Sequence, residues 1–292
     1  MAAAEIMDPR TIGARDDFTI DQNWAHYTPE EHETWNILYA RQTALLPGRA
    51  APEFLRGLQR LNLDRGGIPD FDRLNEDLHR ATGWTIVAVP CLVPDAIFFE
   101  HLANKRFPAG NFIRARAQLD YIQEPDVFHD VFGHVPLLAD PVFADYMQAY
   151  GAGGLRSLGF DRLKNLAALY WYTVEFGLIR TPEGLRIYGA GIVSSQAESK
   201  FALDDPSPNR VHFDLERVMR TDYRIDDFQQ TYFVIDSFQE LFDATLQDFK
   251  ALYERLPKAF QHRPEDLTAA DHIYNAGSQA YAKAGGRMAL AD

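Results

Sequence analysis

Cysteine is the scarcest residue in this sequence, because Cys91 is the only one in 292 residues. A single thiol cannot form a disulfide within the chain, which excludes a small secreted scaffold held together by disulfides. The fold must therefore be stabilised by a buried apolar core, and 46% hydrophobic residues over this length are ample for one. We expect a globular protein of a reducing compartment, the cytoplasm.

Long hydrophobic runs and an excess of positive charge are also missing. No uninterrupted run reaches the roughly 18 apolar residues of a membrane span, and Met1–Ile6 lacks the basic start and apolar centre of a secretion signal. The chain has 29 Lys and Arg against 42 Asp and Glu, a formal charge of −13. Nucleic acids and anionic membrane surfaces are bound by basic patches, so we expect neither as a partner.

The pattern of apolar residues predicts a fold that is mainly α with a few short β-strands. The segments with helical spacing are 29–45, 52–61, 68–83, 95–104, 141–150, 161–178 and 237–256. Short strands are predicted at 84–89 and 112–114, the second followed by a turn at 119–121. A further strand is expected from Arg186, entering a glycine-containing turn that leaves Ser194 exposed. No internal repeat, flexible linker or compositional break interrupts this pattern, so we expect one domain.

Two histidines, His129 and His134, lie five positions apart among apolar and acidic residues. Imidazole nitrogens suit iron, zinc or copper, which makes the pair candidate metal ligands. On a straight α-helix, at about 100° per residue, positions five apart point about 140° away from each other. We therefore expect the helix to end between them, with His129 in its last turn and His134 on the loop beyond. Gly133 and Pro136 are typical of such a helix end.

Glu175 is the candidate for a third ligand. The run 163–179 is apolar around nearly its whole circumference, which predicts a buried helix. A lone buried carboxylate costs on the order of several kcal/mol unless a positive group holds it, and Lys164 is about three turns away. A single histidine on an apolar face is more often a core residue than a ligand. Two histidines with a buried glutamate favour a metal site with positions left open for chemistry.

Three motifs in this sequence resemble those of the aromatic amino acid hydroxylases, and most closely those of the bacterial members that act on phenylalanine. They are Glu-Pro-Asp-x-x-His-Asp-x-x-Gly-His-Val-Pro at 124–136, Tyr-Trp-Tyr-Thr-Val-Glu-Phe-Gly-Leu at 170–178 and Tyr-Gly-Ala-Gly-x-x-Ser-Ser at 188–195. The resemblance implies a single aromatic amino acid hydroxylase catalytic domain at 24–256. Residues 1–23 show no convincing period, and we expect them to form an N-terminal arm that is mobile or becomes ordered on contact. A C-terminal tail at 257–292 packs on this domain or extends from it. Animal members have a preceding regulatory domain and a heptad-bearing tail that forms tetramers; we find neither here and expect a monomer.

The resemblance also implies the chemistry. One Fe(II) is held by His129, His134 and Glu175, and a tetrahydropterin, either tetrahydrobiopterin or a related bacterial pterin, acts as cosubstrate. The other reactants are O2 and L-phenylalanine, and the product is L-tyrosine. Tyr170 matches a residue beside the iron, and we group it with Glu175 as catalytic.

Further residues match family positions that bind the substrate. Arg114 matches the arginine that grips the substrate carboxylate bidentately, although a surface arginine is the simpler interpretation. Asp126 matches the residue that orients this arginine, and Ser194 a serine near the substrate carboxylate and a ligand histidine. The positions that match the substrate's ring pocket are Trp171, Phe176 and Ile225, the last being aliphatic in phenylalanine-specific members. For Trp171 and Phe176 plain core packing is an equally good interpretation.

For the pterin, Phe98 matches the aromatic residue that stacks on the bicyclic ring, and Val93 belongs to the loop that hydrogen-bonds it. Asp130 stands where animal members have a glutamate, so its contact with the pterin could be direct or through water.

Three alternatives stay open. A tyrosine or tryptophan hydroxylase would share every motif quoted. A zinc hydrolase also uses two histidines and a glutamate, but the H-E-x-x-H pattern would place glutamate where Asp130 follows His129. A protein that binds metal or pterin without catalysis is the third.

Overall fold

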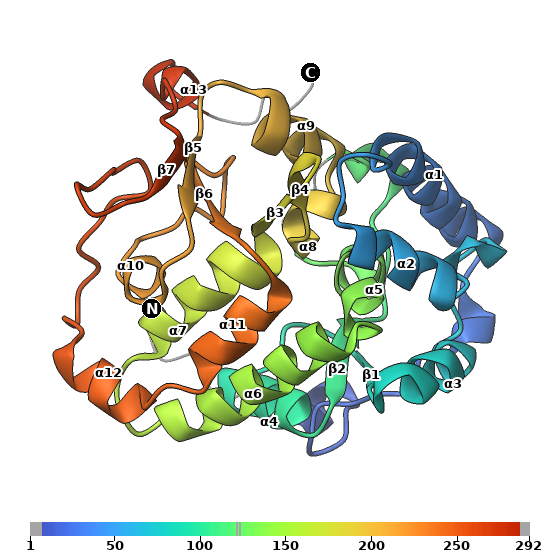
Figure 1. Cartoon of the computed structure of the whole chain (residues 1–292). Helices are drawn as coiled ribbons and strands as arrows, with labels where there is room; N and C mark the ends of the chain where they lie inside the picture. The colour runs from blue at the N-terminus through green and yellow to red at the C-terminus, as the bar shows by residue number, and fades with distance from the viewer. Residues whose placement is uncertain (1–7, 121, 123, 287–292) are drawn as a thin grey trace.

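The computed structural model describes residues 8–120, 122 and 124–286, and helices dominate them. The helices are α1 (Pro29–Leu45), α2 (Pro52–Arg60), α3 (Phe71–Thr82), α4 (Asp95–Ala103), α5 (Val135–Leu138), α6 (Pro141–Ser157), α7 (Leu163–Tyr170), α8 (Ala190–Val193), α9 (Gln196–Asp204), α10 (Leu215–Met219), α11 (Phe238–Thr245), α12 (Phe249–Arg255) and α13 (Ala280–Lys283). Two wider, π-helical turns span Phe128–His134 and Trp171–Glu175. The predicted mainly α fold with a few short strands is confirmed (Figure 1).

The helix boundaries follow local signals in the sequence. At the start of α1 the Thr28 side chain accepts a hydrogen bond from the Glu31 amide (3.2 Å), and the Glu31 carboxylate accepts one from the Thr28 amide (2.7 Å). This reciprocal cap satisfies two amides that the first turn leaves free. At the C-terminal end of α3, Gly83 has a φ of 78°, a left-handed conformation that glycine adopts without strain.

The strands form one small and one larger sheet. In the small sheet β1 (Thr85–Val89) pairs in parallel with β2 (Arg106–Gly110). The larger sheet has the strand order β4-β3-β6-β5-β7. Its strands are β3 (Leu178–Thr181), β4 (Gly184–Ile187), β5 (Asn209–His212), β6 (Thr231–Ile235) and β7 (Ile273–Asn275). Parallel pairs at its centre are flanked by the antiparallel strands β4 and β7.

Several predicted boundaries are wrong. The strand expected at 112–114 is not formed; the strand that pairs with β1 is β2, whose proline and glycine gave no strand signal. Of the predicted turn at 119–121, Tyr121 lies outside the described residues.

Three of the predicted helices also end differently. The helix predicted at 141–150 continues to Ser157. The helix at 161–178 stops at Glu175, because Leu178 already belongs to β3. The helix at 237–256 is two helices, since the Asp248 carboxylate caps α12 by accepting from the amides of Lys250 and Ala251.

The turn that carries both histidines is anchored by an aromatic core on its other side. Phe128 and Phe132 stack with ring centroids 4.8 Å apart and are fully buried. Trp35 of α1 meets Phe128 edge-on at 5.2 Å, and Phe54 of α2 meets Phe132 at 5.8 Å. Aromatic pairs of this kind contribute roughly 0.5–1.5 kcal/mol each beyond the area they bury. The core therefore fixes the histidine-bearing turn from behind.

Helices α4 and α6 pack unusually closely, and they lie side by side in Figure 1. A Cβ added to Gly154 of α6 would lie 2.2 Å from the Phe99 ring of α4, so only glycine permits this approach. Phe98, the predicted pterin-stacking residue, is the neighbour of Phe99 on α4. Its backbone is therefore held by the α4–α6 contact.

The described parts of the expected arm and tail contact the rest of the chain. Ile20 bridges to Ala88 of β1, and the carbonyl of Asp17 lies 2.8 Å from Nε2 of His101. In the tail β7 pairs with β5, and a buried ion pair joins Asp271 to Arg217 of α10 (2.9 Å). Residues 1–7 and 287–292 of the two segments lie outside the description, and the boundaries at 23 and 257 stay predictions.

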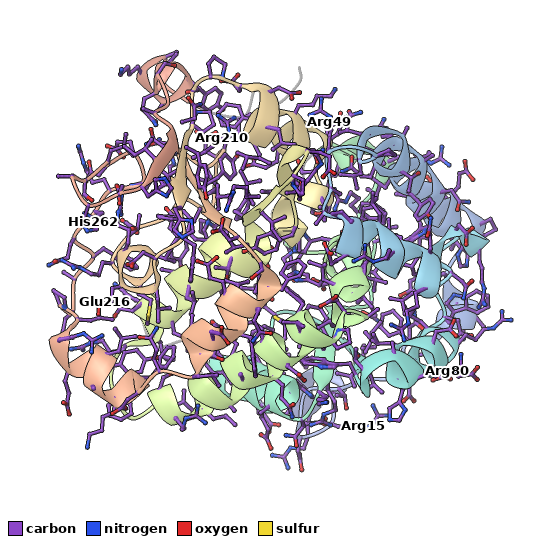
Figure 2. The ribbon with its side chains drawn as sticks, viewed as in Figure 1. Arg15, Arg49, Arg80, Arg210, Glu216 and His262 are labelled. Carbon is purple, nitrogen blue, oxygen red and sulfur yellow. The ribbon has the colours of Figure 1, made fainter. Side chains whose placement is uncertain are left out.

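Exposed ion pairs lie around the periphery of the molecule. Arg49, labelled in Figure 2, pairs with Asp204 at the end of α9 (2.8 Å), and Glu216 pairs with Arg255 of α12. Pairs of this type typically contribute about 0–1 kcal/mol. No helix of the described residues is long and apolar enough to cross a membrane.

Candidate metal centre and active site

His129 and His134 lie in the same continuous helical segment, so the prediction that the helix ends between them is wrong. The turn Phe128–His134 is π-helical and continues directly into α5. In a π-helix hydrogen bonds join residues five apart, which brings such residues onto one face. The geometry that an α-helix denies to this spacing is thus achieved by a wider winding.

Gly133 and Pro136 have other roles than ending a helix. A Cβ on Gly133 would lie 3.0 Å from the carbonyl oxygen of Ala190, so glycine lets α8 approach the turn. Pro136 lies in the first turn of α5, where a missing amide hydrogen is tolerated.

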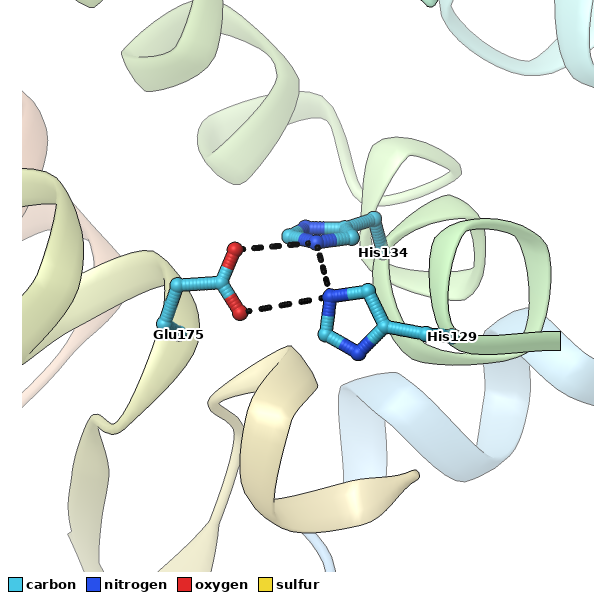
Figure 3. A group of neighbouring side chains, drawn as sticks. All are labelled: His129, His134 and Glu175. Atoms are coloured by element: carbon cyan, nitrogen blue, oxygen red, sulfur yellow. Dashed lines mark hydrogen bonds and ion pairs between the residues drawn. The ribbon is translucent and has the colours of Figure 1, made fainter. Parts of the chain in front are cut away.

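Glu175 completes a group of three with the histidines (Figure 3). It lies at the end of the π-helical turn that extends α7. Its Oε1 lies 3.2 Å from Nε2 of His134, its Oε2 lies 3.5 Å from Nε2 of His129, and the two Nε2 atoms are 3.4 Å apart. All three donor atoms fall within 4.8 Å of one another. Two imidazoles and a carboxylate with this convergence can hold one divalent transition metal.

Burial sets the protonation states that a metal requires. It lowers the pKa of His129 to about 4, so this imidazole is neutral near pH 7. Burial alone would raise the pKa of Glu175, but the contact with His134 outweighs burial and the pKa is lowered. The site therefore presents a neutral nitrogen donor and an ionised oxygen donor.

Ser194 fixes the tautomer of His129. The predicted exposure of Ser194 is wrong, because the residue is only 7% exposed. Its hydroxyl donates to the carbonyl of Ala190 (2.7 Å) and lies 3.0 Å from Nδ1 of His129. Since a hydroxyl has one hydrogen, the imidazole must donate from Nδ1. The lone pair of His129 is thereby left on Nε2, which faces Glu175 and His134.

The second histidine is held by aromatic rings instead. Nδ1 of His134 is buried and makes no hydrogen bond within the described residues. Its ring lies against Phe107 of β2, with centroids 4.9 Å apart, and stacks at 6.2 Å on Tyr170. Phe107 is a site residue that sequence reasoning missed, because β2 itself was not predicted.

Asp126 and Arg114 form a buried pair directly behind His129. Nε and Nη2 of Arg114 each donate to Asp126 at 2.8 Å, and the Arg114 amide donates at 2.9 Å. The carboxylate also accepts from the amide of His129 (3.0 Å). Although burial opposes it, Arg114 lowers the pKa of Asp126, which is therefore ionised. One carboxylate thus orients both the arginine and the ligand-bearing turn.

A cavity of about 250 Å³ opens beside the three candidate ligands. The predicted pterin residues Val93, Phe98 and Asp130 line it together with Tyr170. The Phe98 ring meets the Tyr170 ring edge-on at 5.6 Å. Asp130 accepts from the amide of Gly110 (2.7 Å), and burial raises its pKa to about 7. A flat molecule in this cavity would lie against the Phe98 ring and next to the metal ligands.

The predicted substrate residues do not line this cavity. Trp171 and Phe176 contact each other with ring centroids 4.8 Å apart, and Trp171 stacks on Tyr223 at 5.0 Å. The indole N–H of Trp171 donates to Oε1 of Gln229 (2.9 Å), a partner that no motif indicated. Ile225 is 69% exposed, and its part in the ring pocket stays a prediction.

Comparison with known proteins identifies the family. The family model described as biopterin-dependent aromatic amino acid hydroxylase matches residues 20–283. The chain belongs to this family. It is 68% identical over 277 residues to the phenylalanine-4-hydroxylase of Caulobacter vibrioides, and the matched residues cover 95% of this chain and 94% of the relative.

Solved structures of a relative agree with this hydroxylase fold. The iron- and phenylalanine-bound crystal structure of the Chromobacterium violaceum phenylalanine hydroxylase is 56% identical, with a TM-score of 0.85 over 92% of this chain and 100% of that chain. A second structure of that enzyme, with bound iron(III) and oxidized 7,8-dihydrobiopterin, has a TM-score of 0.86 at 56% identity, over 94% of this chain and 100% of that one.

Replacing Ser194 by alanine should weaken metal binding by this hydroxylase roughly 10- to 100-fold, the usual cost of removing a partner of a ligand histidine. The reason is that Nδ1 of His129 loses its hydrogen-bond acceptor, so the tautomer that leaves the lone pair on Nε2 is no longer fixed. The measurement is a titration of metal-free protein with Fe(II) or Co(II). Ser199→Ala is the matched control, since this buried hydroxyl donates to the Ile192 carbonyl of α8 but touches no ligand. Equal affinities of the two variants would contradict the assignment.

Glu198 should make the stability of the hydroxylase fall as pH rises. Burial raises its pKa from 4.5 to about 8, with Tyr232 and the Gln229 amide donating to Oε1. The unfolded carboxyl ionises near 4.5, so between that pH and about 8 unfolding releases a proton and the free energy of unfolding decreases. This contribution is fully present below the unfolded pKa and is lost as pH rises through the folded pKa.

Glu198→Gln removes this titration while keeping an acceptor at Oε1. The free energy of unfolding of this variant should therefore depend less steeply on pH, by at most about 1.4 kcal/mol per pH unit. Denaturant unfolding of both proteins in a metal chelator, from about pH 5 to about pH 8, measures the difference. Parallel curves would show that Glu198 does not hold a proton in the folded state.

Proposed function

We propose that this hydroxylase converts L-phenylalanine to L-tyrosine with O2 and a tetrahydropterin, at one Fe(II) held by His129, His134 and Glu175. The observation that carries the proposal is the convergence of these three donor atoms within 4.8 Å beside the cavity lined by Phe98. The names and bound molecules of the relatives from Caulobacter and Chromobacterium support it. Iron held there supplies redox chemistry with O2 and the reduced pterin, which no side chain can provide.

The residues of the cavity would bind the pterin. Phe98 offers a ring face for stacking, and its edge contact with Tyr170 fixes that face. Asp130, held by the Gly110 amide, offers a polar group at the same wall. The loop that contains Val93 lines the cavity just before the start of α4.

Arg114 would hold the carboxylate of the amino acid. Its guanidinium is oriented by Asp126 through Nε and Nη2, which leaves Nη1 without a hydrogen bond to the described residues. The orientation exists before substrate arrives, so little side-chain entropy is lost on binding. Trp171 and Phe176 would contact the ring, and a fixed carboxylate then determines which ring carbon approaches the metal.

Arg114→Lys should raise the Michaelis constant for phenylalanine roughly 10- to 100-fold, since a charge-assisted hydrogen bond contributes about 1.5–3 kcal/mol. The turnover number should change less, because the metal ligands stay in place. Steady-state kinetics with varied phenylalanine measures both quantities. An unchanged Michaelis constant would show that Arg114 does not bind the carboxylate of phenylalanine.

The substrate is tested by an aerobic assay of iron-loaded protein with a reduced pterin. Phenylalanine, tyrosine and tryptophan are offered separately, and the products are identified by mass. We expect tyrosine from phenylalanine, dependent on both iron and pterin, as the fastest reaction. Faster hydroxylation of tyrosine or tryptophan, or no product from protein shown to hold iron, would contradict the proposal. We also propose, on the sequence grounds given above, a monomer that works in the cytosol.

A further inference from the structure

Gln229 is a buried side chain that joins two parts of the aromatic wall formed by Trp171, Phe176 and Tyr223. The residue is 1% exposed. Its Oε1 accepts from the indole N–H of Trp171 (2.9 Å), and its Nε2 donates to the carbonyls of Arg224 (2.9 Å) and Asp227 (3.3 Å). Both polar atoms of the Gln229 side-chain amide are therefore hydrogen-bonded, the oxygen to the aromatic wall and the nitrogen to the loop Arg224–Asp227.

The chemistry of the partners fixes which way the amide of Gln229 points. An indole N–H can only donate and a backbone carbonyl can only accept. The amide oxygen must therefore face Trp171 and the amide nitrogen the loop. No other residue type of this length offers one acceptor and two donors at these places, so other side chains would leave a buried group unpaired.

Trp171 has no other hydrogen bond by which its tilt could be fixed among the described residues. Its ring stacks on Tyr223 with an interplanar angle of 26° and meets Phe176 at 39°. Stacked rings can slide over one another at little cost, whereas a hydrogen bond at 2.9 Å sets position and direction. Trp171 also begins the π-helical turn that ends in Glu175. The tilt of the indole is thus set by Gln229.

The side-chain amide of Gln229 also hydrogen-bonds to the loop on both sides of Ile225. The carbonyls of Arg224 and Asp227 are the two acceptors, and Tyr223 before them is the ring on which Trp171 stacks. The backbone of Gln229 is itself held, because its amide donates to Glu198 of α9 (3.4 Å). The loop and the indole are therefore connected to one fixed residue.

We propose that Gln229 is a positioning residue that holds the Trp171 indole and the Arg224–Asp227 loop as one unit, and thereby determines which aromatic ring the site accepts. This inference rests on the proposed function of Trp171 as a wall of the substrate pocket. A purely structural Gln229 would contribute to stability alone and leave the choice of ring unchanged.

The test is a double-mutant cycle between Gln229→Met and Trp171→Phe. Methionine keeps the length of the side chain but makes no comparable hydrogen bonds, and phenylalanine keeps an aromatic ring but removes the N–H. The measured quantity is the preference for phenylalanine over tryptophan, as the ratio of the two kcat/KM values and as the ratio of the two dissociation constants from calorimetry. Denaturant unfolding of each variant measures stability separately.

Gln229→Met should lower this preference roughly tenfold in the wild-type background, the scale on which pocket shape discriminates. In the Trp171→Phe background it should lower the preference by a clearly smaller factor, because the bond to the indole is already absent. Gln148→Met is the control: Gln148 lies in the middle of α6, and its Nε2 donates to the carbonyl of Ala103 at the end of α4 (3.0 Å) and not to the aromatic wall or its loop, so the preference should stay unchanged.

An equal effect in both backgrounds, or a loss of stability with an unchanged preference, would overturn the inference. Gln229→Asn keeps the amide and is the second variant if the methionine variant does not fold; it should change the preference in the same direction, and an unchanged preference would count against the inference. Wild-type protein that binds phenylalanine without hydroxylating it would refute the proposed function only. The ratio of dissociation constants would then still decide the role of Gln229.

Discussion

Replacing Glu175 by glutamine is expected to reduce metal affinity by more than the roughly 10- to 100-fold that follows the loss of an outer partner of a ligand. Hydroxylation should fall at least in proportion. The reason is that glutamine offers a neutral oxygen of the same shape, so the variant tests the charge of the donor and not the fold. Its ion-pair partners among the described residues are His129 and His134.

The effect of metal on the stability change distinguishes a metal ligand from a structural carboxylate. In a chelator, Glu175→Gln should change the free energy of unfolding little, because burial of the carboxylate opposes folding while the histidines that lower its pKa offset this cost. With metal present the wild type should become clearly more stable than the variant, since a ligand that binds the folded state stabilises it by mass action. Denaturant unfolding with and without Fe(II) measures both.

Glu100→Gln on the exposed face of α4 is the control for Glu175→Gln, and it should change neither metal affinity nor stability measurably. If Glu175→Gln were strongly destabilised in the chelator and still bound metal normally, Glu175 would be a structural residue and the ligand set would be wrong.

Replacing Asp126 by alanine should cost about 3–5 kcal/mol of the free energy of unfolding, the range for breaking a buried ion pair from one side. Asp126 is 0% exposed and accepts from three donors of Arg114 and from the amide of His129. Its loss leaves the Arg114 guanidinium buried without a carboxylate and frees the start of the histidine-bearing turn. We therefore expect metal affinity to fall together with stability.

The exposed pair of Arg41 and Asp120 provides the comparison. Its side chains are 38% and 75% exposed, and Asp120→Ala should cost about 0–1 kcal/mol. Denaturant unfolding of the two alanine variants in a chelator measures the difference directly. A cost for Asp126→Ala no greater than that for Asp120→Ala would show that the buried pair does not organise the site.

The sequence was informative where the chemistry of single residues decides the outcome. The start of α1 and the end of α3 follow from Thr28 and Gly83, because caps act over a few residues. The three candidate ligands could be selected because a carboxylate in apolar surroundings is costly to bury alone, and two imidazoles with a carboxylate suit a transition metal.

Features that depend on long-range pairing or on unusual winding could not be predicted. The strand β2 has a proline and a glycine and exists through its pairing with β1, so its own residues gave no signal, and Phe107 beside His134 was missed with it. The π-helical turn at His129 was misinterpreted as a helix end, since spacing rules assume α-helical winding. Gln229 lies in no motif, and its role depends on the approach of a loop to Trp171.

The central claim, one iron per chain at His129, His134 and Glu175 that drives phenylalanine hydroxylation, is tested most directly by titrating metal-free protein with Fe(II). Tyrosine formation is followed at each step in the presence of phenylalanine, O2 and reduced pterin. We predict that the rate rises until one equivalent of Fe(II) per chain has been added and then stays constant, and that Glu175→Gln shows no such rise. Tyrosine formation without added iron, or an equal rise in the variant, would contradict the account.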